Sequence, residues 1–240
     1  MGRLGRRLVI TCEHASNRLP ARYGNLGLTV ADVRSHIAWD LGARTIARRC
    51  ARHFSCPYHE GEYSRLLVDL NRSTHNPRLM PRRAWGVRVP GNEAIAQEER
   101  ARRIASYYQP YRDAVYRDIE KTQRRHGSCV HLSIHTFTPQ LRGRVRRADI
   151  GILYDPARAA EREFADRLAA SLKNGGLSVR RNYPYRGTSD GLTTFCRARY
   201  PVSRYLGIEL ELNQRLVTSH ADARRLGITI VRAIPQVLEG

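Results

Sequence analysis

Short runs of consecutive apolar residues recur along the chain, separated by longer stretches whose apolar residues repeat at helical spacing. A short apolar run without alternation is typical of a strand buried on both faces of a mainly parallel sheet. We expect such strands at 8–12, 66–68, 129–134, 150–154, 177–179 and 205–211. The helical spacing predicts helices at 40–53, 92–125, 156–173 and 219–238. Asp40 is well placed as the N-cap of the first helix, and Pro110 should kink or split the second.

The alternation of strands and helices predicts the fold class. It favours an α/β three-layer α/β/α sandwich with a mainly parallel mixed sheet, in one domain covering 1–240. A chain of 240 residues, 41% of them hydrophobic, is long enough to bury one full core. Residues 74–91 are rich in Pro, Arg and Asn and predict a long surface loop, of the kind that usually serves a site. Residues 183–197 predict either a substrate-lining loop or a plain surface loop.

No segment of the sequence predicts a membrane span or an exported protein. The chain has no run of about eighteen apolar residues, which a membrane-crossing helix needs. The apolar stretch near the N-terminus is too short for a signal peptide, so we expect a cytoplasmic protein. The five cysteines form no CxxC pair and predict scattered reduced thiols, with Cys12 and Cys129 in buried strands.

The formal net charge of +20 introduces a second class of function. Basic chains often bind nucleic acid or anionic surfaces. Nearly all the basic residues are arginines, however, and they are spread along the chain rather than gathered in one block. A compositional bias of the source genome produces the same pattern, and we favour that interpretation. The charge would still steer an anionic substrate toward the protein.

Two histidines come just after predicted strands. His14 follows strand 8–12, and His135 follows strand 129–134. In open α/β sheets, functional groups gather outside the carboxyl ends of the strands, where a neutral imidazole can bind a metal ion. A catalytic zinc site typically has three protein ligands and one open position. We therefore predict that both histidines bind one metal ion, Zn²⁺ or another divalent cation, over the alternative that each only makes hydrogen bonds at a strand end.

The third metal ligand has three candidates. Asp40 leads, because a carboxylate at the mouth of the first long helix can face the strand ends. Its role as an N-cap explains the residue nearly as well. His36 and Glu13 are the alternatives, and Glu13 has the further option of pairing with an arginine.

A candidate substrate clamp follows the predicted strand at 66–68. Asn71 and Arg72 place an amide beside a planar cation, which suits the binding of a carboxylate. Asp69 is available to orient Arg72 through a salt bridge. The position directly after a strand distinguishes Arg72 from the many other arginines of the chain.

Two glutamates in the late strand are candidates for proton transfer. Glu209 and Glu211 lie on one face of the strand at 205–211. Buried carboxylates cost too much free energy to be incidental there. We predict that Glu211, nearer the strand end, is the general base toward metal-activated water, and that Glu209 orients a neighbour or pairs with an arginine.

Five segments in order resemble the N-formylglutamate amidohydrolase family: CEHASNRLP at 12–20, HIAWDLGA at 36–43, YSRLLVDLNRS at 63–73, HLSIHTFTP at 131–139 and GIELELNQ at 207–214. That family is similar to the zinc carboxypeptidase and aspartoacylase group, which implies a zinc-carboxypeptidase-like fold. In that group an Asn-Arg pair binds the substrate carboxylate, two histidines hold zinc, and a late-strand glutamate is the base. The resemblance implies these roles for Asn71 and Arg72, for His14 and His135, and for Glu211. One departure is Asn17, which stands where carboxypeptidase relatives have a glutamate ligand.

The prediction for function is a metal-dependent amidohydrolase. It would cleave the amide bond of an N-acyl or N-formyl amino acid, such as N-formylglutamate, so its partner is a small anionic amide substrate. The alternative is a basic nucleic-acid-binding protein with a degenerate hydrolase fold. That alternative is disfavoured because the chain contains no recognised nucleic-acid motif. The sequence does not indicate the oligomeric state.

Overall fold

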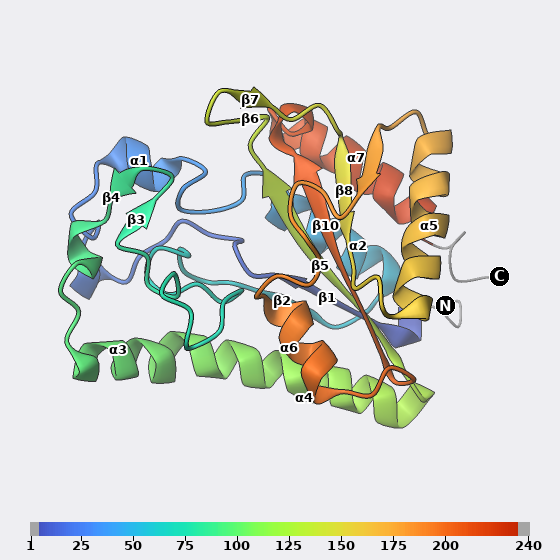
Figure 1. Cartoon of the computed structure of the whole chain (residues 1–240), viewed down its shortest axis with the longest axis horizontal. Helices are drawn as coiled ribbons and strands as arrows, with labels where there is room; N and C mark the ends of the chain where they lie inside the picture. Colours follow the sequence, from blue (N-terminus) through green and yellow to red (C-terminus); the bar gives the residue numbers. More distant parts are fainter. Residues whose placement is uncertain (1–4, 235–240) are drawn as a thin grey trace.

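A computed structural model describes residues 5–234, built around one central sheet (Figure 1). In sheet order, the six strands are β2 (Tyr58–Glu60), β1 (Leu8–Cys12), β5 (Cys129–Phe137), β10 (Tyr205–Asn213), β8 (Ile150–Leu153) and β9 (Val179–Arg181). The first four are parallel to one another, whereas β8 pairs antiparallel with β10 and parallel with β9. The predicted mainly parallel mixed sheet is confirmed.

Helices pack on both faces of the sheet and give the expected three-layer sandwich (Figure 1). One face is covered by α2 (Ala43–Phe54), α5 (Ala159–Asn174) and α7 (His220–Ala233), and the other by α4 (Gln109–His126) and α6 (Leu192–Arg199). α4 continues from α3 (Gln97–Arg103) as one long helical rod (Figure 1). The described residues include no helix that is long and apolar enough to cross a membrane.

The side of the sheet under α2, α5 and α7 is mainly apolar, and we call it the apolar face. Ile10, Leu132 and Leu210, from three adjacent strands, are fully buried there. They belong to the largest core cluster, together with Ile46 of α2 and Leu168 of α5. Complete burial of one aliphatic side chain contributes about 1.5–3 kcal/mol, so this face holds the sheet and its helices together.

The opposite side of the same strands, which we call the polar face, changes character along the strand direction. Near the strand starts, Val9 and Tyr205 form a smaller apolar cluster with α4 and α6. Further along β5 comes the buried hydroxyl of Ser133. Toward the strand ends the face carries His135 and Glu211, which lie opposite each other in the β5–β10 register. Because the side chains on this face change from apolar to ionisable, the reactive groups lie toward the carboxyl ends of the strands.

The predicted strand at 66–68 is wrong. The three residues are buried but lie in an irregular segment. Side chains satisfy their carbonyl groups in place of a neighbouring strand. Asn92 Nδ2 donates to the carbonyl of Leu66 (2.7 Å). Arg103 Nη1 donates to the carbonyl of Leu67 (3.3 Å). A short apolar run thus indicates that the residues are buried, but it does not indicate whether their backbone groups bond to a neighbouring strand or to side chains. The strand that pairs with β1 at this edge is β2, whose sequence is largely polar.

β5 and β10 extend beyond their predicted ends, to Phe137 and Asn213. His135 and Glu211 therefore lie within these strands, not just beyond or at their ends. An alternation of apolar and polar residues marks a strand with one polar face. The final residues of β10 follow that rule, whereas β5 departs from it in its last two residues, Thr136 and Phe137.

Asp40 does not cap α2. The helix begins at Ala43, and its N-cap is Gly42, whose φ of 81° is in the left-handed region that favours glycine. Because Gly42 takes the capping position, the Asp40 side chain is available to the sheet edge.

The other predicted helices are present with different boundaries. The helix expected from residue 92 begins at Gln97, and its interruption is a π-helical turn, Ile104–Tyr108, just before Pro110. The segment 183–197 is not wholly a loop, because α6 begins within it. The helix expected at 219–238 is α7, and residues 235–238 lie outside the described residues. α1 (Val30–Arg34) was not expected.

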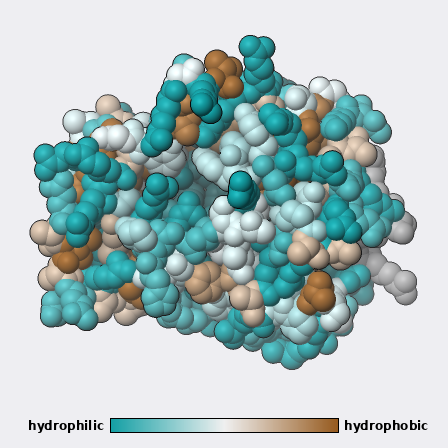
Figure 2. All heavy atoms as spheres, in the orientation of Figure 1, coloured by the Kyte–Doolittle hydropathy of each residue, from teal (hydrophilic) through white to brown (hydrophobic). Residues whose placement is uncertain are grey.

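Two short hairpins extend from the carboxyl-end side of the sheet (Figure 1). They are β3 (Arg83–Ala84) with β4 (Val87–Arg88), within the predicted loop 74–91, and β6 (Gln140–Leu141) with β7 (Arg144–Val145), directly after β5. The surface is hollowed between these hairpins and is mostly hydrophilic around the hollow (Figure 2).

Candidate active site

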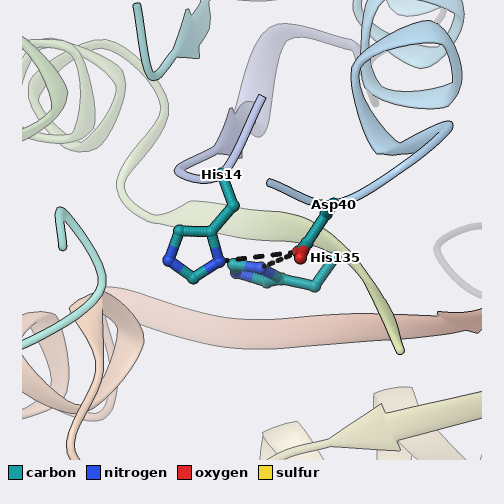
Figure 3. Close-up of side chains that lie close together, drawn as sticks. All are labelled: His14, Asp40 and His135. Atoms are coloured by element: carbon teal, nitrogen blue, oxygen red, sulfur yellow. Dashed lines mark hydrogen bonds and ion pairs between the residues drawn. The ribbon is translucent and has the colours of Figure 1, made fainter. Parts of the chain in front are cut away.

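His14, Asp40 and His135 lie together at the carboxyl ends of β1 and β5 (Figure 3). One potential ligand atom of each lies within 4.8 Å of the others, and all three side chains are buried. Asp40 reaches this point from the loop before α2, where its backbone N–H donates to the His14 carbonyl (2.9 Å). Residues far apart in sequence thus form one compact cluster with the donor types that metals bind.

The two alternatives for the third ligand lie elsewhere. His36 packs edge-on against the ring of Trp85, with 5.5 Å between the ring centroids, and is not part of the cluster. Glu13 is fully buried behind His135, with its Oε2 atom 2.8 Å from His135 Nε2. Of the three carboxylate or imidazole candidates, Asp40 is the one that faces both histidines.

Both imidazoles follow one pattern, with a carboxylate at Nε2 and Asp40 near Nδ1. Asp69 Oδ1 lies 2.7 Å from His14 Nε2, matching the contact of Glu13 with His135. His135 Nδ1 lies 2.9 Å from Asp40 Oδ2, and His14 Nδ1 lies 3.5 Å from the same atom. Metal-binding histidines typically donate their second N–H to a carboxylate, which fixes the tautomer and aims the free lone pair at the metal.

This arrangement fits a divalent cation between the two Nδ1 atoms and Asp40. His14 Nδ1 is buried and makes no hydrogen bond within the described part of the chain. An unpaired buried polar atom costs free energy, and a bound cation would satisfy it. Two imidazole nitrogens and one carboxylate oxygen also form a donor set found in catalytic zinc sites. The residues present therefore fit the metal that the sequence predicts.

The electrostatics of the cluster favour positive charge. Burial alone would lower the pKa of His135, but its hydrogen bonds to Asp40 and Glu13 raise that pKa well above the usual value. Burial would likewise raise the pKa of Asp40, yet the Arg65 guanidinium and the two imidazoles hold it well below its usual range. The carboxylates thus stay ionised in a buried site that stabilises a cation.

Glu211 faces this cluster from β10. It is buried opposite His135, and its Oε2 atom has no hydrogen-bond partner among residues 5–234. Burial raises the pKa of Glu211 to about 8, although the nearby His135 opposes the rise. A carboxyl group with a pKa near neutrality and a free oxygen suits general acid–base catalysis.

Glu209, two residues earlier on the same face, is already engaged. The Thr193 hydroxyl donates to its Oε1 atom. Glu209 therefore ties β10 to the start of α6, which agrees with its prediction as an orienting group. The contrast between a paired Glu209 and an unpaired Glu211 supports the choice of Glu211 as the base.

The structure brings Asn71 into the site and leaves Arg72 at its edge. Asn71 Nδ2 lies 3.4 Å from His135 Nε2, and its Oδ1 accepts from the Leu192 N–H (2.6 Å). Arg72 is partly exposed, and its Nη1 donates to the Asp190 carbonyl. The expected Asp69–Arg72 salt bridge is long, at 3.9 Å, because Asp69 lies closer to His14.

The helical rod formed by α3, the π-helical turn and α4 fixes these segments through three side chains, one at the end of the turn and two in α4. The Tyr108 hydroxyl donates to the Arg72 carbonyl (2.8 Å), and the Tyr111 hydroxyl donates to Glu13 Oε1 (3.2 Å). Arg112, almost fully buried, donates to the Leu70 carbonyl (3.1 Å). Side chains from one helix thus hold both the candidate clamp and the carboxylate behind His135.

Three contributions were missed from the sequence: the contact of Asp69 with His14, the contact of Glu13 with His135, and the buried Arg65. Arg65 Nη2 donates to Asp40 Oδ1, and its guanidinium lies over the Trp85 ring, 5.3 Å from the centroid. Arg65 carried no distinguishing signal, because it is one arginine among many and precedes an apolar run.

The fold and the site together define an α/β protein with the groups that amide hydrolysis needs. The family model described as FGase, N-formylglutamate amidohydrolase, matches residues 6–218. The chain belongs to the N-formylglutamate amidohydrolase family, whose name describes hydrolysis of an amide bond.

Solved structures share this fold. A gene product from Agrobacterium tumefaciens is 32% identical, with 97% of this chain and 90% of that chain covered and a TM-score of 0.88. An N-formylglutamate amidohydrolase from Ralstonia eutropha is 20% identical, with 98% and 94% covered and a TM-score of 0.72, a likeness of fold. No curated protein matches the chain.

Proposed function

We propose that this protein is a metal-dependent amidohydrolase acting on an N-acyl or N-formyl amino acid, with N-formylglutamate as the first substrate to test. The single observation that carries the proposal is the convergence of His14 Nδ1, His135 Nδ1 and Asp40 on one buried point, faced by the unpaired Glu211. Membership of the N-formylglutamate amidohydrolase family supports the choice of substrate.

His14, His135 and Asp40 would hold the metal, Zn²⁺ or another divalent cation. When bound, the cation lowers the pKa of water toward neutrality and polarises the amide carbonyl. Asp69 and Glu13 keep the two imidazoles in the orientation that directs both Nδ1 atoms toward Asp40.

Glu211 Oε2 would accept the proton of the attacking water and pass it to the leaving amine nitrogen. The unpaired oxygen and the pKa raised to about 8 suit both halves of that transfer. The side chain is buried, so bulk water does not compete for the proton.

Arg72 would bind the substrate carboxylate, with Asn71 beside it. Its partly exposed guanidinium is a planar donor that matches a carboxylate. The contacts of Tyr108 and Asp190 fix the Arg72 segment, so binding there would orient the amide toward Glu211 and the cation.

The test combines metal analysis with formate release from N-formyl-L-glutamate. We expect about one metal per chain, with formate release lost on chelation and restored by zinc. His14→Ala and His135→Ala should each lose metal and activity. His53→Ala, an exposed position on α2, should keep both and serves as the matched control. Full metal occupancy in both site variants would show that the site is wrong.

A further inference from the structure

Arg146 presents an unpaired donor near the strand ends. Its Nη1 atom is buried and makes no hydrogen bond to any of the residues that the structure describes. Its guanidinium lies over the ring of Phe137 at 5.7 Å and over that of Tyr185 at 5.5 Å. The backbone is fixed as well, because the Arg146 N–H donates to the Pro139 carbonyl (2.8 Å) and its own carbonyl accepts from Asn213 Nδ2 (2.8 Å). The side chain is thus held in place while one of its donors has no partner.

Phe137 locates Arg146 on the polar face. Phe137 is two residues beyond His135 on β5, and side chains two apart in a strand point to the same side. Its register partner is Asn213, two residues beyond Glu211 on β10. Arg146 therefore lies just past the candidate catalytic centre, at the outer end of the strands.

Asn71 and Arg72 lie toward the other end of the same face. A Cβ added at Gly191 would contact both Asn71 Oδ1 (3.1 Å) and Glu209 Oε1 (3.4 Å), so Asn71 lies at the level of Glu209. From Glu209 to Asn213 the strand rises about 13 Å. Arg146 and the Asn71 amide oxygen thus lie on opposite sides of Glu211 along the strand direction, and Arg72 is the residue that follows Asn71.

The charges around Tyr185 support this placement. Burial raises the pKa of Tyr185, the Glu211 carboxylate adds to the rise, and Arg146 opposes it. The Tyr185 hydroxyl is therefore close enough to feel both groups. Tyr185 belongs to the segment 183–197, one of the two long segments that the sequence associates with a site.

We infer that Arg146 binds a second carboxylate of the substrate, at the end of the site opposite Arg72. A guanidinium that already contacts two rings loses little conformational freedom on binding, and its planar donors match a carboxylate. The inference rests on the proposed function, because it assigns to Arg146 the second carboxylate of the same substrate. It selects N-acyl amino acids with an acidic side chain over those with a neutral one.

The experiment compares N-formyl-L-glutamate with N-formyl-L-glutamine, which has nearly the same shape and lacks the second charge. The zinc-loaded wild type should prefer the glutamate compound by about 10- to 100-fold in kcat/KM, the range of a charged hydrogen bond. Arg146→Gln should abolish this preference through KM, with kcat for the glutamine compound unchanged. Arg144→Gln removes the same charge from an exposed position of the same hairpin and should keep the preference.

Two outcomes overturn the inference: an Arg146→Gln variant that keeps the wild-type preference, or an Arg144→Gln variant that loses it equally. If the wild type hydrolyses neither compound, the proposed function fails, and calorimetric titration with the same compounds tests the subsite separately. Tighter binding of the glutamate compound that disappears in Arg146→Gln supports the inference. Equal binding of both compounds by the wild type overturns it.

Discussion

The apolar face and the polar face of the central sheet are formed by alternate residues of the same strands, and they have different roles. Ile134 of β5 is buried in the apolar core, while the next residue, His135, faces carboxylates on the other side. Leu210 and Glu211 repeat the contrast on β10. Because side chains alternate along a strand, one strand serves packing and chemistry at once.

The apolar face explains why the site tolerates so many buried charges. Burial of unpaired charge costs several kcal/mol per group, and the polar face gathers Glu13, Asp40 and Glu211 around two imidazoles. The apolar face, packed against three helices, supplies the stability that offsets this cost. We therefore expect substitutions on the polar face to change chemistry and substitutions on the apolar face to change stability.

Glu211→Gln should cause the largest change. Removal of the proton acceptor should lower kcat by about 10²- to 10⁴-fold while metal content stays at the wild-type level. Steady-state kinetics of formate release, beside metal analysis of the same sample, provide the measurement. Glu209→Gln is the matched variant two residues away. A larger fall in kcat for Glu209→Gln would transfer the role of base to that residue.

Ile134→Ala tests the apolar face one residue from a proposed ligand. Ile134 is 1% exposed, so its truncation should lower the free energy of unfolding by about 2–5 kcal/mol. The metal affinity of the folded protein should not change, because the side chain points away from the site. Chemical denaturation and a chelator competition assay measure the two quantities. A loss of metal affinity equal to that of His135→Ala would contradict the separation of the two faces.

In the metal-free protein, the free energy cost of burying an ionised Glu211 should appear as a dependence of stability on pH. Its pKa is raised from 4.5 to about 8 in the folded chain. At low pH the carboxyl group is neutral in both the folded and the unfolded chain, so it does not oppose folding. Stability is lost as the pH rises from the pKa of Glu211 in the unfolded chain through its higher pKa in the folded chain. At pH 9 Glu211→Gln should be more stable than the wild type by on the order of a few kcal/mol, with no difference at pH 4. Thermal unfolding across this range would reject the idea if the two proteins behaved alike at pH 9.

Much of the fold could be predicted from the sequence, because apolar runs and helical spacing report burial directly. β1, which leads to His14, and β5, which contains His135, are examples. Their unbroken apolar runs predict strands buried on both faces, and both strands have a neighbour on each side in the sheet. The segment 66–68 shows the limit. Its apolar residues are buried, but its hydrogen-bond partners are the side chains of Asn92 and Arg103, which no local pattern indicates.

The candidate site was predictable where chemistry follows the strand pattern. Glu211 stood out as a charge in an apolar run, and the structure leaves it buried and unpaired. The contacts that orient the site depend on long-range packing. Asp69 meets His14, and Arg65 meets Asp40, only because the irregular segment after β2 folds back over the strand ends. Such contacts join residues distant in sequence, so spacing alone does not reveal them.

The proposed site holds one cation at the junction of the two histidines and Asp40. Anomalous diffraction at the zinc absorption edge, from crystals of the zinc-loaded protein, tests it most directly. We expect a single strong peak at about 2.0–2.2 Å from His14 Nδ1, His135 Nδ1 and an Asp40 oxygen. A peak bound through the Nε2 atoms, or at any other group of residues, would contradict it.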